Sequence, residues 1–209
     1  MCYNANRNES ARHTGIEEET PVEAQKTLVR EKMREWERVL EDFHLPGWDD
    51  FPVLPLYMDQ VIYLMNQYLS PLPQEDEQKP LTPAMINNYV KLGIVPRPVK
   101  KRYGRTHLAY LIMVCILKRT VSTAEIKKLV PASLGEDEIK AVYQAFSSVF
   151  HSGKQTFREN VRQEAAPIWK TDGPSVTELV FRASVLSSLW KDLAEQMLCL
   201  YPEADERDR

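Results

Sequence analysis

The chain has 209 residues, 43% hydrophobic and 27% charged, which is enough length and apolar content for a buried core. Its formal net charge is −3, and Cys2, Cys115 and Cys199 lie far apart without the spacing of a metal site. The longest apolar runs are too short to cross a membrane and the first residues are polar, so we expect a cytoplasmic protein with no membrane partner.

A long amphipathic helix is predicted near the start, over residues 20 to about 43, after a polar segment, 1–19, that is expected to be disordered. Thr20-Pro21-Val22-Glu23 combines a capping box with proline at the first helical position. The apolar residues that follow repeat at spacings of four and three, a heptad seam: Val29, Met33, Trp36, Leu40 and Phe43. This seam can pack on the same chain or on a second one. Residues 20–50 are therefore assigned to this helix and a connector.

The next unit, residues 51–131, is predicted to hold two helices joined by a polar loop at 70–80. The first is expected over 55–69. The second begins at Thr82-Pro83, a capping residue followed by a proline, and ends at Gly93. One face of this second helix is apolar, and the opposite face is small, amide or cationic: Ala84, Asn87, Asn88 and Lys91.

Positive charge is concentrated around and after this helix. Residues 79–128 contain eleven basic side chains and one acid, a balance of +10, whereas the remainder of the chain has −13. We expect Ile94–Arg105 to form a small β-wing, with prolines keeping it extended and Gly104 as its turn. A buried helix from Thr106 and a further helix capped by Ser122 and Glu125 complete the unit. Such a basic segment is typical of a polyanion site.

The order of these elements resembles the DNA-binding domain of MerR-type regulators. The stretch Tyr89-Val90-Lys91-Leu92-Gly93-Ile94-Val95-Pro96 is similar to the end of their recognition helix, and Val121–Ile126, VSTAEI, is similar to their later helix start. The resemblance covers roughly residues 55–131 and is closest to a bacterial family of uncharacterised MerR-like proteins. Asn87 and Asn88 depart from the usual Arg-Tyr pair, so base preference does not transfer.

This resemblance implies a DNA-binding transcription regulator with double-stranded DNA as its partner. Asparagine offers a donor and an acceptor to an adenine edge, and lysine suits guanine or phosphate. The predicted DNA contacts are Thr82, Asn87, Asn88, Lys91, Arg97, Lys100, Lys101, Arg102, Tyr103 and Arg105. The alternative is a helix-turn-helix scaffold that binds an acidic protein instead of DNA, which the 70–80 loop and the acidic remainder favour.

Residues 132–209 are predicted to be a helical dimerisation or sensor region. One helix is expected to start at Ser133–Glu136 and to break at Ser152-Gly153, and a shorter one is expected from Thr156 to near Pro167. The last helix, from Ser175 to about Leu200, has an unbroken heptad seam: Leu179, Ala183, Leu186, Trp190, Leu193 and Met197. MerR-like proteins dimerise through such a helix, which implies a homodimer; packing of this seam within one chain remains the alternative.

The sequence contains no pattern of catalytic or metal-ligating residues, so we expect neither enzymatic activity nor a cofactor. Aromatic residues in the C-terminal region could line a pocket for a hydrophobic cation: Tyr143, Phe146, Phe150 and Trp169. The predicted fold is all-α, a MerR-like winged helix-turn-helix with a small β-wing, flanked by long amphipathic N-terminal and C-terminal helices.

Overall fold

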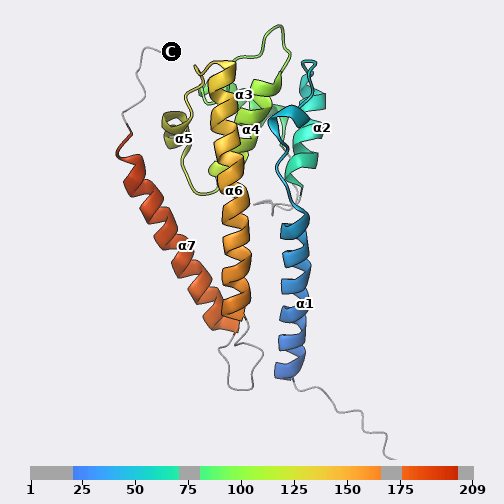
Figure 1. Cartoon of the computed structure of the whole chain (residues 1–209), viewed down its shortest axis with the longest axis vertical. Helices are drawn as coiled ribbons and strands as arrows, with labels where there is room; N and C mark the ends of the chain where they lie inside the picture. Colours follow the sequence, from blue (N-terminus) through green and yellow to red (C-terminus); the bar gives the residue numbers. More distant parts are fainter. Residues whose placement is uncertain (1–20, 71–80, 166–175, 202–209) are drawn as a thin grey trace, which may run out of the picture.

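The computed structural model describes residues 21–70, 81–165 and 176–201. Within these ranges the chain forms seven α-helices and one short 3-10 helix but no β-strand, so the fold is all-α, as predicted (Figure 1). None of these helices is both long and apolar enough to cross a membrane. The expectations for residues 1–19, for the loop 71–80 and for Trp169 lie outside the described residues.

The helices between residues 48 and 129 are short, and those before and after them are long. Their bounds are α1, Pro21–Asp42; η1, Trp48–Asp50; α2, Met58–Leu69; α3, Pro83–Lys91; α4, Arg105–Leu117; α5, Thr123–Leu129; α6, Glu136–Ala165; and α7, Val176–Leu198. The short helices and the N-terminal part of α6 form a head, from which α1, the rest of α6 and α7 extend (Figure 1).

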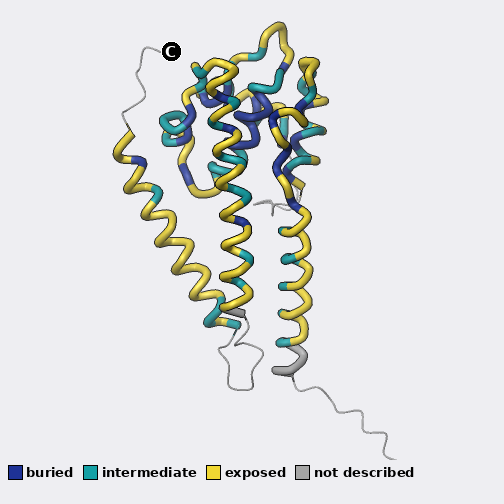
Figure 2. Tube along the Cα trace, viewed as in Figure 1, coloured by how far each residue is buried: buried dark blue, intermediate teal, exposed yellow. Residues whose placement is uncertain are grey.

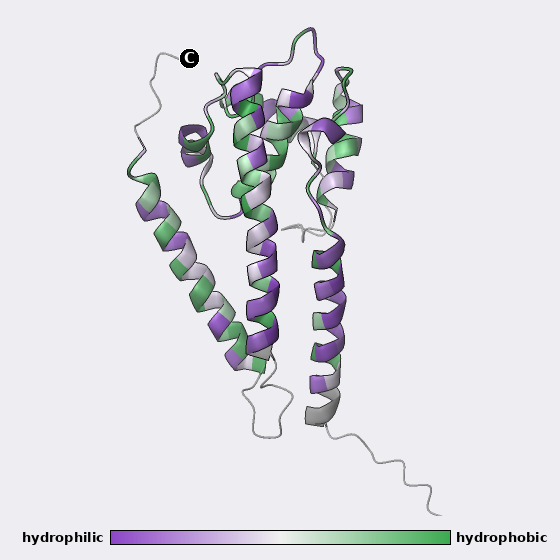
Figure 3. Ribbon diagram, in the orientation of Figure 1, coloured by the Kyte–Doolittle hydropathy of each residue, from purple (hydrophilic) through white to green (hydrophobic). Residues whose placement is uncertain are grey.

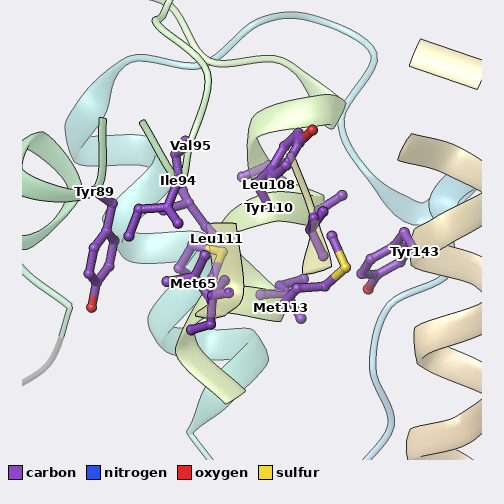
Figure 4. Close-up of a cluster of buried hydrophobic side chains, with 14 of the residues drawn as sticks. Met65, Tyr89, Ile94, Val95, Leu108, Tyr110, Leu111, Met113 and Tyr143 are labelled. Atoms are coloured by element: carbon purple, nitrogen blue, oxygen red, sulfur yellow. The ribbon is translucent and has the colours of Figure 1, made fainter. Parts of the chain in front are cut away.

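The core of the head is built around α4, which is apolar on all sides. A helix of this kind must be surrounded by other elements, and α4 packs against α2, α5 and α6. All residues from His107 to Val114 are buried. Figure 4 shows Leu108, Leu111 and Met113 of α4 among Met65 of α2 and Tyr143 of α6. The buried residues are thus gathered in the head and are sparse along the extensions (Figure 2).

Helix α2 begins three residues later than predicted. Leu56 is extended and pairs with Tyr103: its amide donates to the Tyr103 carbonyl (2.8 Å), and the Tyr103 amide donates to the Leu56 carbonyl (2.9 Å). These two backbone bonds hold Leu56 outside a helix, and the helix starts at Met58. The segment before α2 is thereby tied to the segment before α4.

Helix α6 is one continuous helix of 30 residues, which corrects the predicted break at Ser152-Gly153 and the predicted new start at Thr156. The Thr156 hydroxyl donates to the Ser152 carbonyl (3.1 Å), a bond of a helix interior rather than of a cap. Next to the glycine, Lys154 is only 8% exposed, and its ammonium donates to the carbonyls of Phe43 (2.6 Å) and Glu41 (3.3 Å) at the end of α1. The chain therefore stays helical at the predicted break, where it contacts α1.

The heptad seam of α1 packs on α6 of the same chain. Trp36 meets Phe157 edge to face at 5.2 Å between ring centroids, and Phe43 meets Phe150 in the same way at 5.4 Å. Arg158 forms an ion pair with Glu41 (3.2 Å) beside these rings. The first of the two alternatives for this seam, packing within the chain, is the one that the fold contains.

Helix α7 differs from α1 because its seam is exposed. It diverges from α6 along its length (Figure 1), and its residues are almost all accessible (Figure 2). Trp190 is 69% exposed, and Leu186, Leu193 and Met197 are about half exposed. Only near its end does α7 join the core, through the buried Leu198. Hydrophobic residues recur along this helix (Figure 3), so a single chain leaves an apolar stripe in water.

Candidate nucleic-acid interface

Helix α3 is shaped by local features of its sequence. The Thr82 hydroxyl accepts a hydrogen bond from the Met85 amide (3.3 Å), and Pro83 occupies the first helical position, where no donor is needed. Gly93 adopts a φ of +70°, the left-handed region that glycine enters without strain, and the helix ends there. The structure therefore confirms both predicted ends of this helix.

The two faces of α3 have different environments. Ile86 and Tyr89 are buried in the core, so the helix cannot rotate without losing apolar burial. Asn87, Asn88 and Lys91 are exposed on the other face. A second cation lies beside the end of the helix, since Lys127 Nζ is 3.7 Å from the position that a Cβ on Gly93 would take. The helix thus offers amide and cationic groups to solvent.

The predicted β-wing is reduced to one tight turn over Val99–Arg102. The Arg102 amide donates to the Val99 carbonyl (2.9 Å), and Lys100 and Lys101 have φ angles of 50° and 61°. Two central residues with positive φ are typical of a type I′ hairpin turn. The flanking residues form isolated bridges rather than strands. The turn is at the two lysines and not at the predicted Gly104, which precedes the first residue of α4.

Two arginines next to this turn are held in place by other parts of the chain. Arg102 Nη2 donates to the Tyr57 hydroxyl (2.7 Å), and its guanidinium carbon lies 4.6 Å from the centre of the Tyr57 ring. Arg105 Nε donates to the Phe51 carbonyl (3.1 Å). Both contacts restrict the side chains, so less conformational entropy is lost when a guanidinium meets an anion.

Tyr103 was predicted to contact DNA, and the structure corrects this. Its side chain is 3% exposed because the bridge to Leu56 turns it into the core, where its ring meets His107 edge to face at 5.4 Å. Its neighbours in the predicted set, Arg97, Lys100 and Lys101, are exposed.

His107 connects the start of α4 to the segment before the turn. Its Nδ1 accepts from the Gly104 amide (3.1 Å), so the ring proton is on Nε2, which faces the Arg97 carbonyl at 3.4 Å. Burial lowers the pKa of His107, and the ring is neutral at neutral pH. His107 therefore links two backbone segments and adds no charge to the surface.

Three of the four aromatic residues predicted to line a pocket lie on α6: Tyr143, Phe146 and Phe150. Tyr143 is fully buried, and its hydroxyl donates to the Pro46 carbonyl (2.7 Å) while its ring packs on Phe51. Phe150 packs on Phe43, and Phe146 is partly buried against the core. These three rings belong to the hydrophobic core or pack against it.

Sequence reasoning missed Tyr57 and the apolar residues around the turn. Tyr57 is half exposed and positions Arg102, although the two are far apart in the chain. Val53, Leu54 and Val99 are strongly exposed. Of these three, Val99 alone lies within the basic segment. An apolar residue among cations was the sequence feature that could have drawn attention to it.

The remaining groups considered in the described residues are the thiol of Cys115 and possible metal ligands. Burial raises the pKa of the Cys115 thiol to about 11, so the reactive thiolate is scarce. Within the described ranges, no three His, Cys, Asp or Glu side chains are grouped so that they could hold a metal ion.

Residues 46–146 match the family model described as a domain of unknown function, DUF1836. The matched range runs from just before η1 to the first part of α6. It therefore spans the head, with the outer face of α3 and the turn Val99–Arg102, called the lysine turn below. Helix α1, the distal half of α6 and α7 lie outside it. No curated protein and no solved structure matches the chain.

Proposed function

We propose that this protein is a DNA-binding transcription regulator of the MerR-like winged helix-turn-helix type, acting as a homodimer in the bacterial cytoplasm. The observation that supports this most is the two-faced α3. Its apolar side is fixed in the core by Ile86 and Tyr89, and its outer side offers Asn87, Asn88 and Lys91. An exposed helix with amide groups fits the width and the hydrogen-bonding pattern of the major groove.

In this proposal the turn Val99–Arg102 contacts the DNA backbone. Lys100 and Lys101 are exposed at its tip, and Arg102 is positioned by Tyr57. Contacts of this kind contribute affinity and register but do not read sequence. Base recognition is assigned to α3.

The homodimer is supported by the exposed apolar stripe on α7. Leu179, Ala183 and Leu186 begin a seam that the single chain leaves accessible or half accessible. A second copy would remove this stripe from water at a gain of about 25 cal/mol per Å² of apolar surface. Two copies of α3 would then meet two half-sites of one operator.

The test is a salt titration of binding to duplex DNA. If five to eight phosphates are neutralised per dimer, the logarithm of the binding constant falls against the logarithm of salt concentration with a slope of about −5 to −7. Lys100→Glu with Lys101→Glu should abolish most binding. The matched control is Lys32→Glu with Arg34→Glu, which makes the same charge change at two exposed positions of α1.

Loss of DNA affinity in the turn variant alone supports the proposal. Equal loss in both variants would mean that only net charge matters. Weak binding with a shallow slope in the unaltered protein would contradict the proposal and favour the alternative, a scaffold that binds an acidic protein. A selection of bound genomic fragments then identifies the operator.

A further inference from the structure

A cavity of about 550 Å³ lies at the base of the lysine turn. Its volume is within the range of small-molecule sites, about 300–1,000 Å³. The wall combines apolar and cationic side chains from two segments of the chain: Val53, Pro55, Val99, Lys100, Arg102 and Arg105. None of the DNA contacts proposed above requires an apolar wall, so this combination calls for a different ligand.

The cations of this cavity are partly arranged before any ligand enters. Arg102 is bonded to the Tyr57 hydroxyl, and Arg105 is bonded through Nε alone to the Phe51 carbonyl. Glu136 is the one acid in the lining, set against three cations, and His107 is neutral. The cavity is therefore cationic, with guanidinium groups whose geometry suits a carboxylate or sulfonate.

The apolar part of the wall is accessible. Val53 is 78% exposed and Val99 is 71% exposed, and both line the cavity. Apolar side chains left in water beside fixed cations match a ligand that has both an apolar body and an anionic group. An inorganic anion would use only the arginines and leave the valines exposed.

We infer that this cavity binds a small organic anion with an apolar body, such as an aromatic carboxylate. Where the proposed DNA binding holds, the ligand would compete with the DNA backbone, because Lys100, Arg102 and Arg105 serve both. The site would then make DNA binding responsive to a metabolite of this chemical class.

The experiment measures binding of 2-naphthoate to the full chain by calorimetry, with neutral 2-naphthamide as the probe that lacks the charge. Val53→Glu places a carboxylate in the wall and should weaken naphthoate binding by about tenfold or more, which corresponds to about 1.4 kcal/mol. Leu54→Glu is the matched control, since Leu54 is also 78% exposed but does not line the cavity. Thermal unfolding of both variants verifies that each is folded.

Saturable naphthoate binding that is lost in Val53→Glu, retained in Leu54→Glu and weak for the amide supports the inference. Absence of saturable binding overturns it, as do equal affinities for acid and amide or equal behaviour of the two variants. In a second arm, naphthoate is titrated into the complex with duplex DNA and should displace it. Displacement failure refutes the competition alone, whereas absence of any DNA binding refutes the proposed function and leaves the naphthoate result standing.

Discussion

At the scale of single residues, the lysine turn holds two side chains in a conformation that they disfavour. Lys100 and Lys101 both have positive φ, and for a residue with a Cβ this costs about 1–2 kcal/mol. Asparagine and glycine occupy such turns more readily. Two cations therefore occupy a position where their backbone conformation is unfavourable.

This leads to a prediction in which stability and DNA affinity change in opposite directions. Lys100→Asn with Lys101→Gly should raise the free energy of unfolding by about 1–2 kcal/mol, because both residues tolerate positive φ. The same variant should bind DNA more weakly, because two cations are lost. Chemical denaturation and DNA titration measure the two effects.

The control for this variant is Lys100→Ala with Lys101→Ala, which removes the same charges without relieving the backbone. It should lose the same DNA affinity and gain no stability. If the two double variants are equally stable, the turn does not have the type I′ conformation in solution.

Residue roles that depend on local chemistry could be predicted from sequence, and those that depend on distant segments could not. The Thr82 cap was predictable because a cap bonds to the helix that immediately follows it. The burial of Tyr103 was not, because it depends on pairing with Leu56 from before α2. The position of Arg102 on Tyr57 is unpredictable for the same reason.

At the scale of elements, α6 continues through a glycine that would ordinarily end or weaken a helix. Gly153 is exposed, and a Cβ added there would meet no atom within 4 Å. Glycine in a helix interior costs about 0.5–1 kcal/mol relative to alanine. The helix must therefore be sustained by packing with α1 rather than by its own propensity at this point.

We expect Gly153→Ala to raise the free energy of unfolding by about 0.5–1 kcal/mol, since it restores helix propensity in open space. Gly93→Ala should act in the opposite direction, because that residue has a φ of +70°. Thermal and urea unfolding of the two variants provide the comparison. Destabilisation by Gly153→Ala would mean that α6 is interrupted there in solution.

The element boundaries show which information a sequence contains. Capping boxes and prolines gave the starts of α3 and α5 correctly, as Ser122 and Glu125 form the predicted reciprocal bonds. The predicted helix start at Thr156 was wrong, because Lys154 binds the carbonyls at the end of α1 and the chain there is already helical. Tertiary contact overrode the local preference, and such contact is not encoded in neighbouring residues.

At the scale of the whole molecule, the charge and the apolar surface are separated. The cationic turn and the outer face of α3 belong to the head, whereas the exposed apolar stripe belongs to α7, outside the matched family range. Substitutions on α7 can therefore be made without altering the cationic face of the head.

We therefore predict that Leu186→Glu with Trp190→Glu converts the protein to monomers, measured by sedimentation. Both residues are half exposed or more in one chain, so the substitutions should leave the fold intact. Ser184→Glu with Ser188→Glu is the matched control on the opposite side of the same helix. The salt slope for DNA should fall by about half in the monomer, because one set of phosphate contacts is lost.

A monomeric unaltered protein, or dissociation by both double variants, would contradict the assignment of α7 as the dimer contact. If the variant Leu186→Glu with Trp190→Glu remained dimeric, the dimer contact would have to lie on another surface.

The continuity of α6 also has a mechanical consequence. Tyr143 lies in the core of the head, and Arg162, which pairs with Glu37 of α1, is nineteen residues further along the same rigid helix, about 29 Å at 1.5 Å per residue. A tilt of about 5° at Tyr143 would displace the far end by about 2–3 Å over such a length. A small repacking around Tyr143 that tilted the helix would therefore be magnified at its far end.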